Sequence, residues 1–151
     1  MKIFLARHAK AGKRLRVRDK YRQLVPDGHI QATQIASFFE PVALDAIYTS
    51  PAVRCRQTVE PTAAQKELEV VETESLWEDS TPADIAREIN STTTTASLWC
   101  SHGNLIPYVL EELQISSIAT TRRGAVKGSI WVIEGEPHHW QTASYLQPSD
   151  L

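Results

Sequence analysis

The chain has 151 residues, of which 42% are hydrophobic and 23% are charged, and its formal net charge is −2. This length suits one domain with a buried core, and the composition excludes a disordered, collagen-like or disulfide-dense chain. No run of about 18 apolar residues is present, so no membrane span is expected. The charges at Arg7-His8 come too early for a secretory signal. Cys55 and Cys100 do not have the spacing of metal ligands, and we interpret both as packing residues. Because two cysteines suggest no disulfide framework, we expect a cytoplasmic protein.

The charge is distributed unevenly along the chain. Residues 1–22 contain nine Lys or Arg residues against Asp19 alone, whereas the remainder holds seven basic and 17 acidic residues. A basic arm on an acidic body favours an anionic partner near the end of the first strand. The alternative is that the outer residues of this arm form only a solvated loop.

Hydrophobic periodicity, prolines and helix-starting residues divide the chain into alternating strands and helices. In chain order, the sequence predicts a strand at residues 2–6, a basic loop with weak helical character at 10–26, a helix at 27–39, a short strand at 46–48, a helix from a Ser50 N-cap to residue 66, a strand at 68–72, a helix at 81–90, a strand at 96–101, a helix at 102–113, and two strands at 128–134 and 140–145 joined as a hairpin.

Strands that alternate with helices indicate a mostly parallel sheet that is covered on both faces. The closing hairpin makes that sheet mixed. We therefore expect a single α/β domain over residues 1–151, with a three-layer α/β/α architecture, a mostly parallel central sheet and a C-terminal hairpin.

Four segments carry residues suited to phosphoryl chemistry, and each follows a predicted strand. They are Arg7-His8, Ser50-Pro51-Ala52-Val53-Arg54, Leu76-Trp77-Glu78-Asp79 and Ser101-His102-Gly103. The carboxyl ends of parallel strands meet at one rim of a sheet, and ligands of open α/β folds bind there. We expect the four segments to converge on that rim.

Three of these segments resemble the core motifs of the histidine phosphatase superfamily, also called phosphoglycerate-mutase-like. The matching stretches are Arg7-His8, Ser50-Pro51-x-x-Arg54-x-x-Gln57-Thr58 and Ser101-His102-Gly103, in the family's order and spacing. The first motif ends in Ala9, where the family commonly has Gly. The small size is similar to that of SixA-type phosphohistidine phosphatases. Segments such as Lys127-Gly128-Ser129 also resemble phosphatase domains that are fused behind Nudix hydrolases in actinobacteria, although this chain contains no Nudix domain.

The resemblance implies a role for each matching residue. His8 would be the nucleophile and form a phosphohistidine intermediate. Arg7 and Arg54 would hold the phosphoryl oxygens, and His102 would supply a further donor. Glu78 would be the general acid, with Asp79 in reserve. A water molecule would then release phosphate, and no metal or cofactor would be needed.

Four further residues are candidates for binding the phosphate or the rest of the substrate. Lys13 and Arg14 belong to the basic arm, and Gly103 and Asn104 follow His102. We expect no metal site, because His138-His139 lies in a hairpin turn without a third ligand nearby. The loop holding Arg122-Arg123 has no assigned role.

The expected function is that of a metal-independent phosphatase of SixA size, because the chain lacks the long insertions that enclose a sugar phosphate. The substrate would be phosphohistidine in a protein, or a small phosphate ester. One alternative is a phosphatase of nucleotides or dinucleoside polyphosphates. Another is a non-catalytic phosphate-binding module. Nucleic-acid binding is disfavoured, because the basic arm has no interleaved aromatic residue beyond Tyr21 and the body is acidic. The tryptophans, including Trp77, are interpreted as packing residues.

Overall fold

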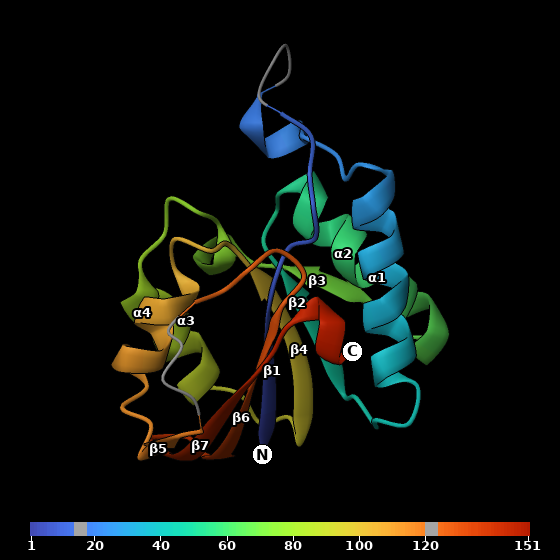
Figure 1. Cartoon of the computed structure of the whole chain (residues 1–151). Helices are drawn as coiled ribbons and strands as arrows, with labels where there is room; N and C mark the ends of the chain where they lie inside the picture. Colours follow the sequence, from blue (N-terminus) through green and yellow to red (C-terminus); the bar gives the residue numbers. More distant parts are fainter. Residues whose placement is uncertain (14–17, 120–123) are drawn as a thin grey trace.

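A single mixed sheet forms the centre of the molecule in the computed structural model, which describes residues 1–13, 18–119 and 124–151 (Figure 1). The strands of the described residues lie in the order β3-β2-β4-β1-β6-β7-β5. Their bounds are β1 Lys2–Arg7, β2 Ala46–Thr49, β3 Val70–Glu72, β4 Ala96–Ser101, β5 Ser117–Ile118, β6 Ile130–Glu136 and β7 His139–Leu146.

The strand directions determine which residues share a rim. β3, β2, β4 and β1 are mutually parallel, so their carboxyl ends lie on the same side. β6 is antiparallel to β1 and pairs with β7 as the predicted hairpin. The beginning of β6 therefore lies beside the end of β1, and residues that precede β6 reach the same rim.

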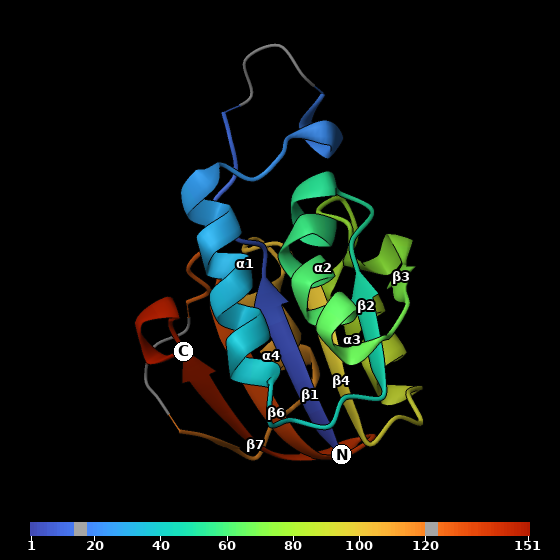
Figure 2. The same ribbon diagram turned by 90° about the vertical axis from the view of Figure 1, so that its right-hand side faces the viewer.

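Four helices of the described chain cover the two faces of the sheet. α1 (Pro26–Phe39) and α2 (Val53–Lys66) lie on one face, while α3 (Pro82–Asn90) and α4 (Ile106–Glu112) lie on the other (Figures 1 and 2). Side chains alternate along β1: Ile3 and Leu5 join the core under α3 and α4, and Phe4 and Ala6 join the core under α1 and α2. The three-layer α/β/α prediction is confirmed.

Two predicted helix starts were wrong. The helix after β2 begins at Val53 with Ala52 as its N-cap, so Ser50 is not the cap residue. The last helix begins at Ile106 rather than at residue 102, because residues 103–105 form a turn after β4. The side chains of these two residues, Ser50 and His102, hydrogen-bond to each other at the rim of the sheet instead of capping a helix. The two-residue strand β5 was not predicted; its shortness leaves no periodic signal.

The basic arm leaves the end of β1 and returns to the start of α1. A bridge between Ala11 and Leu24 pairs its two sides, and the Leu24 N–H donates to Gln57 Oε1 at 2.8 Å. The weak helical character predicted for this arm corresponds to a 3-10 turn at Asp19–Tyr21. The 3-10 turn of this arm lies above the rim of the sheet in Figure 1 and contacts α2, where Asp19 pairs with Arg54.

Candidate active site

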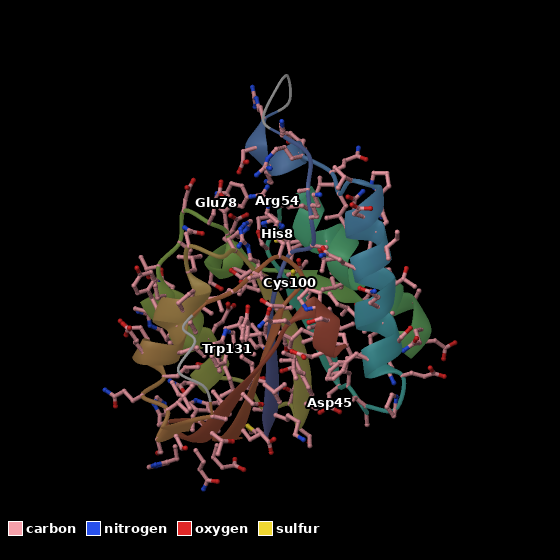
Figure 3. All side chains as sticks on the ribbon, in the orientation of Figure 1. His8, Asp45, Arg54, Glu78, Cys100 and Trp131 are labelled. Atoms are coloured by element: carbon pink, nitrogen blue, oxygen red, sulfur yellow. The ribbon has the colours of Figure 1, made fainter. Side chains whose placement is uncertain are left out.

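A cavity of about 450 Å³ opens at the carboxyl-end rim of the parallel strands; we call it the rim cavity. His8, Arg54 and Glu78 lie close together at this rim in Figure 3. The described residues that line the cavity are Arg7, His8, Arg22, Arg54, Glu78, His102, Gly103, Asn104 and Lys127. The four sequence segments that were expected to converge therefore do so.

The His8 imidazole is buried and its orientation is fixed. Its Nδ1 lies 2.8 Å from the Ala9 carbonyl oxygen, which can only accept, so Nδ1 carries the proton and Nε2 keeps a free lone pair. Burial lowers the pKa of His8 to about 3; the hydrogen bond to Ala9 acts in the opposite direction, and Arg54, His102 and Arg7 lower the pKa further. The ring is thus neutral at ordinary pH and presents a nucleophilic nitrogen.

Arg7 lies against the backbone of Gly103. A Cβ atom at Gly103 would be 2.7 Å from Arg7 Cζ, so only glycine lets the guanidinium lie there undisturbed. Nη1 of Arg7 donates to the Ala125 carbonyl at 2.8 Å. Its buried Nε, like the Nε of Arg54, has no acceptor among the described residues. Buried N–H donors without an acceptor destabilise the folded protein, and a bound anion would supply the missing acceptors.

Arg54 is buried at the first turn of α2, with only 1% of its surface exposed. Its Nη1 donates to the Asp19 carbonyl at 2.8 Å, and its Nη2 lies 3.2 Å from both Asp19 Oδ2 and Glu78 Oε2. The guanidinium carbon also lies 5.8 Å from the centre of the Trp77 ring. These contacts fix the plane of the guanidinium before any ligand binds, which lowers the cost of ordering it.

Asp19 and Glu78 form a carboxyl pair around that one nitrogen. Burial raises the pKa of Glu78, and the hydrogen bond from Glu78 to Asp19 and the negative charge of Asp19 raise it further. Burial also raises the pKa of Asp19, but the hydrogen bond with Glu78 and the charges of Arg22 and Arg54 lower it well below its usual range. The shared proton therefore resides on Glu78, which makes this group the potential proton donor of the cavity.

His102 connects the cavity to Ser50. Nδ1 of His102 lies 3.2 Å from Arg54 Nη2, which can only donate, and Nε2 lies 2.8 Å from Ser50 Oγ. In this arrangement Nδ1 accepts from Arg54 and Nε2 donates to Ser50. For His102 to donate to a phosphoryl oxygen, as the sequence predicted, Nδ1 must carry the proton. The Ser50 hydroxyl allows this tautomer, because the hydroxyl can donate to Nε2 as well as accept from it.

Several site residues were missed by the sequence-based interpretation. They are Asp19, Arg22, Ser50, Trp77 and Lys127. Trp77 packs against the core as the sequence predicted, and its ring also meets His102 edge-on with the centroids 5.3 Å apart, a contact that was not predicted. Ser50 belonged to a recognised motif, and Lys127 to a recognised segment, so a signal existed for both. Asp19 and Arg22 lie in the charged arm, where no periodic pattern marks them.

Of the two residues predicted from the basic arm, Lys13 and Arg14, only Lys13 belongs to the part of the chain that the structure describes. Lys13 is exposed and is not among the described residues that line the rim cavity, and Arg14 lies outside the described residues. Arg122-Arg123 also lies outside them. Asn104 does line the cavity, and its Nδ2 donates to the Glu78 carbonyl at 3.0 Å, which steadies the segment that carries Glu78.

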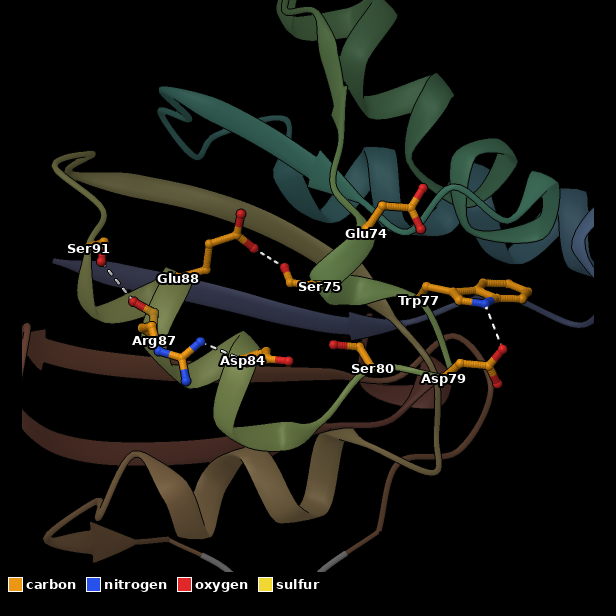
Figure 4. Close-up of a pocket in the computed structure, with 9 residues that line it drawn as sticks. All are labelled: Glu74, Ser75, Trp77, Asp79, Ser80, Asp84, Arg87, Glu88 and Ser91. Atoms are coloured by element: carbon orange, nitrogen blue, oxygen red, sulfur yellow. Dashed lines mark hydrogen bonds and ion pairs between the residues drawn. The ribbon is translucent and has the colours of Figure 1, made fainter.

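A second hollow of about 520 Å³ lies between η2 (Glu74–Leu76) and α3 (Figure 4). Four carboxylates line it, and its single cation, Arg87, is tied to Asp84 at 2.7 Å. Trp77 at its edge donates through Nε1 to Asp79 at 3.1 Å. An acidic hollow repels phosphate, so the two hollows differ in charge as well as in place.

Two kinds of structure are absent from the described part of the chain. No group of three or more His, Cys, Asp or Glu residues in it is arranged to hold a metal ion. None of its helices combines the length and the apolar character that crossing a bilayer requires.

A buried neutral imidazole that shares a cavity with two arginines, at the rim of an α/β/α sheet, is an arrangement suited to binding phosphoryl groups. The model of the histidine phosphatase superfamily (branch 1) matches residues 3–88, more than half of the chain. The chain belongs to this superfamily of phosphatases.

Individual proteins resemble the chain over most of its length. An 8-oxo-(d)GTP phosphatase of Mycolicibacterium smegmatis is 27% identical over 98% of this chain, which spans about half (48%) of that relative. The protein histidine phosphatase SixA, solved with tungstate, superposes with a TM-score of 0.86 at 19% identity and covers 99% of both chains. A SixA-assigned protein of Nakamurella multipartitia is 26% identical, with a TM-score of 0.73 over 87% of this chain and 83% of its own.

Proposed function

We propose that the chain is a metal-independent phosphatase that works through a phosphohistidine intermediate on His8. The observation that carries this proposal is the His8–Ala9 hydrogen bond, which leaves Nε2 unprotonated on a ring that lines the rim cavity together with Arg7 and Arg54. A neutral, immobilised imidazole next to two fixed guanidinium groups is the combination that nucleophilic phosphoryl transfer requires.

The reaction follows from these positions. His8 Nε2 attacks phosphorus, and the bond from phosphorus to the leaving group breaks as the new P–N bond forms. Arg7 and Arg54 hold the non-bridging oxygens, and Glu78 gives its proton to the leaving group. Water then attacks phosphorus, the P–N bond breaks, and orthophosphate leaves while His8 returns to its neutral form.

Two substrate classes have separate support. A phosphohistidine protein is favoured by the likeness of the fold to that of the SixA proteins. A nucleotide is favoured by the relative from Mycolicibacterium smegmatis, whose name states an 8-oxo-(d)GTP phosphatase activity. The two classes differ in their leaving groups, an imidazole in the first and a phosphate or alkoxide oxygen in the second.

One experiment tests the proposed reaction. The purified protein is incubated in EDTA with p-nitrophenyl phosphate, a phosphohistidine protein and a panel of nucleotides, and phosphate release is measured. We expect turnover without added metal, together with a phosphoenzyme that an alkaline quench retains. Activity that appears only after metal is added, or phosphate binding without turnover of any substrate, would contradict the proposal.

Gly103→Ala should lower activity without unfolding the protein. The added methyl would lie 2.7 Å from Arg7 Cζ and must push the guanidinium out of the rim cavity. We expect kcat/KM to fall about 100-fold, because a displaced donor no longer meets the transition state. Gly124→Ala is the control, since a Cβ there meets no atom of the described chain within 4 Å. Equal kcat/KM values in Gly103→Ala and Gly124→Ala would show that activity does not depend on this position of the Arg7 guanidinium.

Glu78→Gln should slow ester hydrolysis more than phosphohistidine hydrolysis, because a protonated imidazole leaves without further help. Glu78 must be protonated to act, so activity on esters should fall as pH rises through its raised pKa. Asp19→Asn removes the neighbouring negative charge, lowers the pKa of Glu78, and should move this alkaline limb to lower pH. The measurement is kcat against pH for both substrates. Glu78 would not be the general acid if Asp19→Asn left the alkaline limb unchanged. The same conclusion would follow if Glu78→Gln slowed the hydrolysis of both substrates equally.

A further inference from the structure

Lys127 is a cation of the rim cavity that the proposed reaction leaves unused. The Gly128 N–H donates to the His8 carbonyl at 3.1 Å, and the Arg7 N–H donates to the Ser129 carbonyl at 3.0 Å. These bonds extend the β1–β6 pairing to the rim and fix the backbone next to Lys127 beside the nucleophile. The side chain of Lys127 is exposed, lines the cavity, and makes no hydrogen bond or ion pair with the described residues.

The charges around the cavity balance without Lys127. Arg22 is neutralised by Asp19, whose Oδ1 lies 2.8 Å from both Nε and Nη2 of Arg22. A transferred phosphoryl group carries up to two negative charges, which Arg7 and Arg54 match. Glu78 is uncharged when it acts as the proton donor. Lys127 therefore remains as one uncompensated positive charge when a single phosphoryl group is bound.

The topology places this charge on the side of the nucleophile that is opposite to Arg54. Along the rim the strand order is β2, β4, β1 and β6, which corresponds to Arg54, His102, Arg7-His8 and then Lys127. Arg54 and Lys127 are therefore on opposite sides of the nucleophile. A lysine on a flexible four-carbon stem serves as a movable point charge for phosphate rather than as a fixed fork.

We propose that Lys127 forms a subsite for a second phosphate, adjacent to the one that is transferred, so that the preferred substrate is a diphosphate ester. This inference rests on the proposed function and deepens it, because an imidazole leaving group has no anion for Lys127. In the reaction, His8 Nε2 bonds to the terminal phosphorus and the bond from that phosphorus to the bridging oxygen breaks. The bridging oxygen leaves with the electron pair as part of a monophosphate, which Lys127 stabilises by its charge.

The binding test uses methylenediphosphonate, which cannot be hydrolysed at its P–C–P link, and inorganic phosphate as the single-phosphate probe. Titration calorimetry measures both dissociation constants for the wild type, for Lys127→Met and for the control Lys2→Met. Lys2 is half-exposed and lies at the opposite end of β1, where it pairs with Glu134. We expect Lys127→Met to weaken methylenediphosphonate about 10- to 100-fold more than it weakens phosphate, as the loss of a charge-assisted bond predicts. Lys2→Met should leave both constants unchanged.

The kinetic test compares kcat/KM for a nucleoside diphosphate with kcat/KM for p-nitrophenyl phosphate. The ratio between these substrates should fall at least tenfold in Lys127→Met and should stay constant in Lys2→Met. Equal losses on both substrates, or an unchanged ratio in both kinds of measurement, would overturn the subsite. The two proposals fail separately: turnover of p-nitrophenyl phosphate tests His8 chemistry, whereas the selective weakening of methylenediphosphonate tests Lys127 even in a protein that does not turn over.

Discussion

Replacing His8 with alanine is expected to reduce kcat by about 10⁴-fold or more, because both ring nitrogens of His102, the other imidazole among the described lining residues, are already hydrogen-bonded to Ser50 and Arg54. Phosphate binding should persist, since Arg7 and Arg54 keep their positions. The measurements are kcat on p-nitrophenyl phosphate and the dissociation constant of phosphate by calorimetry. A loss of kcat with binding retained is the signature of a missing nucleophile.

The alanine variant also deletes a buried hydrogen bond, so a second variant separates chemistry from folding. His8→Asn keeps an N–H for the Ala9 carbonyl but offers no nucleophilic nitrogen, and it should be as inactive as His8→Ala. His29→Ala is the matched control, because His29 is exposed on α1. If either His8 variant kept more than about one hundredth of the wild-type kcat, the reaction would have to proceed without a bond to His8.

Arg54→Ala is expected to lower kcat/KM by about 10³-fold, an effect typical of removing a fixed cation from a phosphoryl-transfer site. Arg54→Lys should recover little of this loss, because an ammonium group cannot reproduce the planar fork. The substitution also removes the cation that Asp19 and Glu78 share. We therefore expect the free energy of unfolding to fall by about 1–2 kcal/mol at neutral pH, and by less at acidic pH where Glu78 is protonated.

Arg56→Ala provides the control on the same helix. Arg56 is half-exposed at 42% and pairs with Glu60 and Glu72 on the outer surface. Exposed ion pairs of this kind contribute less than about 1 kcal/mol, so both activity and stability should change little. Kinetics and urea unfolding of the two variants would show whether the effect belongs to the cavity. Similar losses of kcat/KM in both variants would contradict the assigned role of Arg54.

The sequence was informative where short-range patterns determine the outcome. The alternation of apolar strands and helices predicted the three-layer fold, and the helix at Pro82–Asn90 begins after Thr81 as its residues indicate. The spacing of Arg7-His8, Arg54 and His102 predicted that they meet at one rim, because parallel strands end on the same side. The prediction from sequence was wrong at Ser50. Its side chain does not cap α2 but forms a hydrogen bond with His102, a residue 52 positions away.

The family was thus determined by the sequence alone, and the sequence also predicted His8 as the nucleophile and Arg7 and Arg54 as the phosphate-facing arginines, because each of these inferences depends on residue type and order along the chain. Tertiary structure decided the rest. The tautomer of His8 depends on how its own backbone turns, and the raised pKa of Glu78 depends on Asp19, which belongs to the distant basic arm. Lys127 enters the cavity only because β6 runs antiparallel to β1. Contacts between segments so distant in the chain carry no local pattern, so only the folded arrangement reveals them.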